Sequence, residues 1–133
     1  MNINYRQVLT GAEKYKTPMA SFLRDLIAIP AESGREEARI ARIKLEMEQV
    51  GFDRVEIDPM GNILGYLGSG KRLIAMDAHI DSVGVGDRSL WSYDPFKGFE
   101  DDEVIVGRGA SDQLGGMAAM VYGARLIKDF DLR

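Results

Sequence analysis

Apolar residues recur at helical spacing in two stretches of the first half of the chain, and both stretches carry residues typical of helix ends. The first helix is predicted to start with Thr17 as its N-cap and Pro18 at its first position. The second is predicted to follow the capping-box pattern of Ser33 and Glu36 and to end at Gly51. The apolar positions are Phe22, Leu23, Leu26 and Ile27 in the first helix and Ala38, Ala41, Leu45 and Val50 in the second, with Ile40, Ile43 and Met47 flanking.

After Gly51 the pattern changes to short runs rich in β-branched residues, separated by turns that contain glycine and proline. These runs predict strands at 54–57, 62–67 and 72–78, and a further strand at 104–106. The segment between them, from residue 82 to residue 102, is predicted to be irregular. Helical spacing returns after Asp112 and predicts a third helix with apolar positions Met117, Met120, Val121, Ala124 and Ile127.

The predicted strand at 72–78 is apolar on both faces through the run Leu73-Ile74-Ala75-Met76. A central strand covered by helices has this pattern. The sequence therefore predicts an α/β fold in which strands ending at Ala78 and near Gly107 share one sheet, with helices on both of its faces. Sheets of this class bind ligands at the carboxyl ends of their strands, so the candidate chemistry is expected there.

Three side chains that can bind or support a metal ion follow these two strand ends. His79 is the only histidine in the sequence, and Asp81 lies two residues after it. In this spacing both side chains leave the strand end on the same side, so Asp81 is expected to accept a hydrogen bond from the imidazole nitrogen that does not bind metal. Asp112 follows the next predicted strand, and its carboxylate is expected to face the same crevice and to be able to bridge two cations.

Each of these residues also has a structural interpretation. A lone histidine is commonly a surface residue or a hydrogen-bonded core residue. Asp112 is well placed to cap the helix that follows it. Gly107-x-Gly109 begins like a dinucleotide-binding fingerprint, but Asp112 takes the sixth position, where its charge repels a pyrophosphate. The acidic run at 101–103 is expected to be a solvated turn.

Composition argues against several classes of partner. The 133 residues carry 17 lysines and arginines against 21 aspartates and glutamates, a net charge of −4, so no basic field attracts nucleic acid or an anionic membrane. The absence of cysteine excludes disulfides and thiolate metal sites. The N-terminus lacks the charged start and apolar run of a signal peptide, and a cytoplasmic location is expected. The length and the hydrophobic content of 45% predict one compact domain.

The order of these motifs resembles that of a known enzyme family. The motifs are His79-x-Asp81-x-Val83, Trp91-x-x-Asp94-Pro95-Phe96 and Gly107-Arg108-Gly109-x-x-Asp112-x-x-Gly115-Gly116. They resemble the co-catalytic zinc amidohydrolases that include acetylornithine deacetylase, succinyl-diaminopimelate desuccinylase and carboxypeptidase G. Residues 28–33 and 50–52 resemble that family's opening helices, so the resemblance covers nearly the whole chain. Residues 58–62 and 111–116 are similar to a hydrolase subgroup linked to selenium-dependent purine catabolism.

The resemblance implies a three-layer α/β/α sandwich with a mixed sheet, of which residues 1–133 form the N-terminal part. It implies that His79 binds one zinc ion, that Asp81 is the catalytic residue orienting His79, and that Asp112 bridges two zinc ions, with cobalt or manganese as alternative metals. It also implies a cis peptide bond between Asp112 and Gln113 in the intact protein, whereas for residues 1–133 alone both the cis and the trans form are left open. The family has a lysine where this chain has Leu114, so the substrates of its better-known members are not expected to carry over.

The activity implied for the intact protein is zinc-dependent hydrolysis of an amide bond in a small molecule or a peptide. The family's general base, its other ligands and an inserted dimerisation domain are expected beyond Arg133. The chain alone is therefore expected to be inactive, to hold no tightly bound metal, and to self-associate through uncovered apolar surface and an open sheet edge. The alternative is a non-catalytic α/β binding or assembly module in which His79 and the aspartates are structural.

Overall fold

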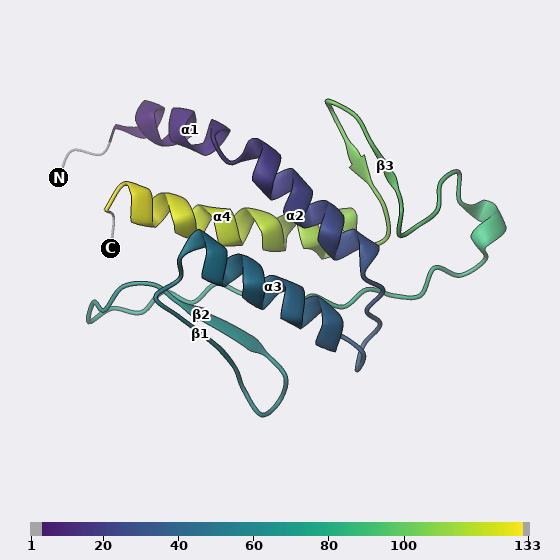
Figure 1. Ribbon diagram of the computed structural model, residues 1–133, viewed down its shortest axis with the longest axis horizontal. Helices are drawn as coiled ribbons and strands as arrows, with labels where there is room; N and C mark the ends of the chain where they lie inside the picture. The colour runs from purple at the N-terminus through teal and green to yellow at the C-terminus, as the bar shows by residue number, and fades with distance from the viewer. Residues whose placement is uncertain (1–3, 132–133) are drawn as a thin grey trace.

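The computed structural model describes residues 4–131, which form four α-helices and two β-hairpins (Figure 1). The helices are α1 (Tyr5–Glu13), α2 (Lys16–Ala28), α3 (Glu37–Val50) and α4 (Gly115–Asp129), and the strands are β1 (Arg54–Ile57), β2 (Ile63–Tyr66), β3 (Phe99–Glu100) and β4 (Ile105–Val106). Helices α2, α3 and α4 pack against one another, and α1 contacts α4. The antiparallel β1–β2 hairpin packs on α3, whereas the antiparallel β3–β4 hairpin extends from the end of the molecule at which α4 begins.

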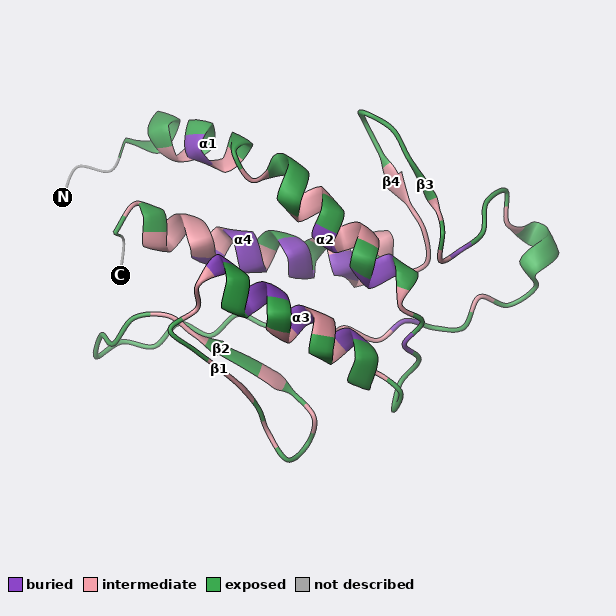
Figure 2. Ribbon diagram, in the orientation of Figure 1, coloured by how far each residue is buried: buried purple, intermediate pink, exposed green. Residues whose placement is uncertain are grey.

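The hydrophobic core lies between α2, α3 and α4, whose facing sides are buried (Figure 2). Removing this apolar surface from water is the main favourable contribution to folding. The large, fully buried apolar side chains are Phe22, Leu26 and Ile27 of α2, Ile43 of α3, Leu114 at the N-cap position of α4, and Val121 within α4. Within residues 4–131, no helix has both the length and the apolar character needed to cross a membrane.

Helix α2 confirms the first predicted helix, but it begins one residue before Thr17. Its N-cap position is Tyr15, which makes no side-chain capping bond, so the predicted role of Thr17 as N-cap is wrong. Pro18 lies in the first turn, where an amide donor is not needed. The apolar pattern does not predict α1, whose sequence signal is Asn4: its side chain accepts a hydrogen bond from the backbone two residues later at 3.1 Å.

Helix α3 ends at Gly51 as predicted, but its predicted start is wrong. Glu36 takes the N-cap position and makes no side-chain capping bond there. The Ser33 hydroxyl donates a hydrogen bond to Asp81, and it does not accept one from a backbone N–H of the helix as a cap would. Residues 32–35 close a turn, with the Arg35 amide donating to a carbonyl three residues earlier at 2.8 Å, and this turn delays the start of the helix.

The buried face of α3 also differs from the predicted one. Leu45 is 54% exposed and two of the predicted alanines are exposed, whereas Arg39 and Glu46 are buried. The Arg39 guanidinium donates to two backbone carbonyls, including that of Ile80 at 2.6 Å, and Glu46 accepts a hydrogen bond from the Tyr122 hydroxyl. Charged side chains can occupy the interior when they are paired in this way. An apolar pattern alone therefore assigns the wrong face.

The mixed α/β composition confirms the predicted fold class and is consistent with the N-terminal portion of a larger domain. The strands at 54–57 and 62–67 are confirmed as β1 and β2, and β4 falls within 104–106. The strand predicted at 72–78 is not formed, because it has no ladder partner within residues 4–131. Leu73 and Ile74 are each 86% exposed. Residues 4–131 therefore form two small sheets, where a single sheet between two helical layers was predicted.

Candidate metal centre

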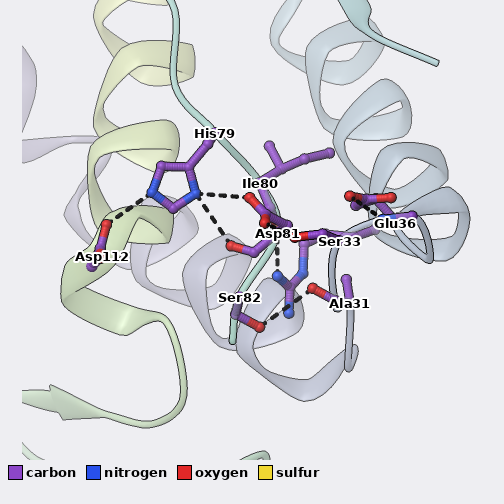
Figure 3. Close-up of polar contacts among 10 residues, drawn as sticks. Ala31, Ser33, Glu36, His79, Ile80, Asp81, Ser82 and Asp112 are labelled. Carbon is purple, nitrogen blue, oxygen red and sulfur yellow. Dashed lines mark hydrogen bonds and ion pairs between the residues drawn. The ribbon is translucent and has the colours of Figure 1, made fainter. Parts of the chain in front are cut away.

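His79 and Asp112, the two predicted metal ligands, lie face to face although 33 positions separate them in the sequence. The His79 Nε2 is 2.8 Å from the Asp112 Oδ1 (Figure 3). His79 lies on the extended segment after the β1–β2 hairpin, and Asp112 lies in the turn before α4. Their side chains are 46% and 89% exposed, so the pair is accessible to ions from solvent. The structure brings the two residues together, and their role as ligands stays a prediction.

Asp81 lies on the other side of the imidazole ring, as the His-x-Asp spacing predicts. Its Oδ1 is 3.1 Å from the His79 Nδ1, and its backbone carbonyl oxygen is 3.3 Å from the same nitrogen. Its Oδ2 accepts a hydrogen bond from the Ser33 hydroxyl, a contact that the sequence does not predict. The Ser33 hydroxyl, followed by the His79 ring, holds the pKa of the Asp81 carboxyl below its usual range. An ionised Asp81 can therefore hold the orientation of the ring.

The turn Ala110–Leu114 directs Asp112 toward His79 rather than into a helix cap. The Asp112 backbone is extended, with φ −124° and ψ 92°, and its peptide bond to Gln113 is cis, as the resemblance implies for the intact protein. The N-cap position of α4 is Leu114, which has no side-chain capping bond. The interpretation of Asp112 as a helix cap is therefore wrong.

An open cavity of about 280 Å³ is lined by the segment that contains His79 and Asp81 and by the segment that contains Asp112. Residues 79 and 81–83 line one wall, and residues 107–112 line the other. A Cβ atom at Gly107 would lie 2.5 Å from a methyl group of Ile27, and Gly109 has φ 81°, a left-handed conformation that favours glycine. Close packing on α2 and the turn before Asp112 thus explain the Gly-x-Gly motif without a nucleotide.

The chemistry of these donors fits a divalent metal ion. An imidazole nitrogen and a carboxylate oxygen are ligands that zinc accepts, and the second nitrogen of His79 is already held by a carboxylate. The two atoms of the 2.8 Å contact, His79 Nε2 and Asp112 Oδ1, would be the ones to hold the ion, and the contact would open to admit it. Within residues 4–131, no three side chains of histidine, aspartate or glutamate are grouped as a metal site. The described residues therefore supply two candidate ligands.

Leu114 takes the position at which the resembled family has a lysine. Its side chain is fully buried and belongs to the hydrophobic core together with Leu26 and Val121. No cation therefore projects from this position toward the site. The departure from the family pattern is accommodated by packing and leaves the His79–Asp112 contact intact.

His79 is expected to titrate above the ordinary histidine pKa of about 6.5 in the metal-free chain. The hydrogen bond to Asp112 is the main cause, and the contact with Asp81 adds to it. Because the folded pKa is raised, the contact stabilises the fold fully below about pH 6.5, and this stabilisation is lost as the pH rises through the folded pKa. An NMR titration of the ring measures this pKa without ambiguity, because the sequence has one histidine.

Asp112→Asn is expected to lower the pKa of His79, whereas Asp102→Asn, in the exposed turn between β3 and β4, is the matched control and should leave it unchanged. A pKa for His79 at or below the ordinary value in the unmodified chain would contradict the contact.

Comparison with known proteins finds a family match over the part of the chain that contains this site. Residues 75–133, which include His79, Asp81 and Asp112, match the family described as Peptidase family M20/M25/M40. The matched residues therefore cover both walls of the cavity. Over these residues the chain matches this peptidase family, and the relatives that it resembles include a desuccinylase, in agreement with the resemblance of the motifs.

Individual relatives extend the similarity to the helices that precede the matched residues. The chain is 58% identical to the uncharacterized protein YgeY of Escherichia coli K12 over 131 residues, which cover 98% of the chain and 32% of that protein. It is 32% identical over 113 residues to succinyl-diaminopimelate desuccinylase of Buchnera aphidicola, covering 83% of the chain and 30% of the relative. The chain thus spans about a third of the length of these curated relatives.

Proposed function

We propose that residues 1–133 form part of the active site of a metal-dependent hydrolase that cleaves an amide bond in a small molecule or a peptide. The observation that carries this proposal is the 2.8 Å contact between the His79 Nε2 and the Asp112 Oδ1, two residues that line an open cavity. The family match and the similarity to a desuccinylase support hydrolysis as the class of reaction.

In this proposal, His79 and Asp112 hold zinc, cobalt or manganese through the Nε2 atom and the carboxylate. Bound zinc lowers the pKa of a coordinated water toward about 7 and polarises the substrate carbonyl. Asp81 keeps the proton of His79 on Nδ1, which leaves the Nε2 lone pair for the metal. Asp112 has a carboxylate that is 89% exposed, so its second oxygen is accessible to a second ion.

We further propose that the general base and the remaining ligands lie outside residues 1–133. The relatives are about three times as long as the part that the chain covers, which leaves ample sequence for these residues. Two ligands leave most of the coordination shell to water, so a metal held by this chain alone binds weakly.

Metal-dependent turnover by the full-length protein that carries this chain tests the proposed function. Purified protein is stripped with a chelator and assayed against N-acyl amino acids and dipeptides before and after addition of Zn²⁺, Co²⁺ or Mn²⁺. We expect hydrolysis that is lost on stripping and restored by metal, and no turnover by residues 1–133 alone. Protein that binds metal and hydrolyses none of these amides would instead support the non-catalytic binding or assembly module.

A further inference from the structure

We infer that Ser33 is a positioning residue of this site, which acts by fixing the Asp81 carboxylate and, through it, the imidazole ring of His79. The inference rests on the proposed function and adds a residue to its machinery. Ser33 lies outside residues 75–133, so the family match that covers His79 and Asp81 does not reach it.

The two oxygens of the Asp81 carboxylate have different partners. Oδ2 accepts a hydrogen bond from the Ser33 hydroxyl, and Oδ1 lies 3.1 Å from the His79 Nδ1 (Figure 3). Rotation of the Asp81 carboxylate would break both contacts. The Ser33 hydroxyl therefore helps to keep the carboxylate in the orientation in which it contacts His79. Without the Ser33 hydroxyl, only the His79 contact restrains the Asp81 carboxylate, which can then rotate about its terminal bond at little cost. The ring would then lose part of its fixed orientation toward Asp112.

The backbone around Ser33 is tied to the segment that carries the site. The Ser82 amide donates to the Ala31 carbonyl oxygen at 2.8 Å, and the Arg39 guanidinium donates to the Ile80 carbonyl oxygen at 2.6 Å. In the sequence, these two contacts lie on either side of the Ser33–Asp81 contact, and they join the loop between α2 and α3 and the first turns of α3 to residues 80–82. The hydroxyl is therefore delivered to Asp81 by a fixed frame, which explains why Ser33 does not cap α3.

The experiment compares Ser33→Ala, which removes the hydroxyl, with Ser33→Thr, which keeps it, and with Ser69→Ala, a matched control on an exposed turn. Both positions are at the surface, so the three variants are expected to fold. The first measurement is the NMR spectrum of the His79 ring in the metal-free chain. Ser33→Ala is expected to broaden or split the ring signals, whereas Ser33→Thr and Ser69→Ala keep the single sharp set of the unmodified chain.

The second measurement is the Zn²⁺ affinity of the full-length protein that carries the same variants. Mutation of the direct hydrogen-bond partner of a metal-binding histidine typically costs between 10-fold and 100-fold in affinity. Ser33 acts one step further away, through Asp81, so we expect Ser33→Ala to weaken Zn²⁺ binding at the lower end of this range, by about 10-fold. Ser33→Thr is expected to restore it. A residue with a merely structural role would lower the melting temperature without changing the ring signals or the affinity.

The two measurements separate this inference from the proposed function. Unchanged ring signals and unchanged Zn²⁺ affinity in Ser33→Ala, in a protein that hydrolyses amides, would overturn the positioning role alone. Altered ring signals and weaker Zn²⁺ binding in a protein that hydrolyses no amide would support the positioning role while the proposed function fails.

Discussion

Replacing Arg39 by methionine is expected to lower the free energy of unfolding by about 2 kcal/mol, because it leaves two part-buried carbonyl oxygens without their Arg39 donors. The Arg39 side chain is fully buried and donates to the carbonyl oxygens of Ile29 and Ile80. Each unsatisfied buried acceptor costs about 1–3 kcal/mol. Burial lowers the pKa of Arg39, because the charged guanidinium is desolvated. The methionine variant has no charge to desolvate, and this offsets part of the lost free energy of unfolding.

Urea denaturation followed by circular dichroism measures the effect of Arg39→Met. Arg35→Met is the matched control, because Arg35 is exposed and lies just before α3. Its change should stay within about 0.5 kcal/mol. Equal stabilities for the two variants would show that the carbonyl contacts of Arg39 contribute nothing, and the buried position of this arginine would need another cause.

Replacing either His79 or Asp112 by alanine is expected to abolish metal-dependent hydrolysis by the full-length protein that carries this chain. In the proposed function, loss of either ligand would remove the ion that stabilises developing charge, a contribution of several kcal/mol, so kcat/KM should fall by at least about 10³-fold. Asp81→Asn keeps an acceptor beside the His79 Nδ1, and its loss should be about 10-fold to 100-fold.

The order of these effects is the informative result. Metal content measured on the same preparations should fall in the His79→Ala and Asp112→Ala variants and remain unchanged in Asp102→Ala, the exposed-turn control. Full activity in Asp112→Ala with normal metal content would remove Asp112 from the site, despite its contact with His79.

The sequence predicts those parts of the fold that depend on local pattern. The α2 and α4 segments have continuous apolar faces, and Gly51 ends α3, so these features are confirmed. The buried face of α3 is not predictable in this way, because Arg39 is stabilised by carbonyl groups far away in the sequence. The strand at 72–78 fails for the same reason, since a strand depends on a neighbour that a local pattern does not contain.

The residues of the candidate site also differ in how far the sequence predicts them. His79, Asp81 and Asp112 are found from residue type, spacing and the expected strand ends, and the structure brings them together. Ser33 is missed because its local pattern favours a helix cap, and only the packing of α3 shows that its hydroxyl reaches Asp81. The local capping pattern at Ser33 thus competes with its contact to Asp81, and the structure has the contact to Asp81.

The long sequence separations within the site also determine when it forms during folding. His79 meets a partner 33 positions later, and Asp81 meets one 48 positions earlier, so both contacts close long loops. Helical segments form from local contacts and are fast, whereas contacts between distant residues follow chain collapse. The ring of His79 is therefore expected to reach its native environment only after α2, α3 and α4 have docked. The NMR signal of the His79 ring therefore reports the last stage of folding, whereas the circular dichroism of the helices reports an earlier stage.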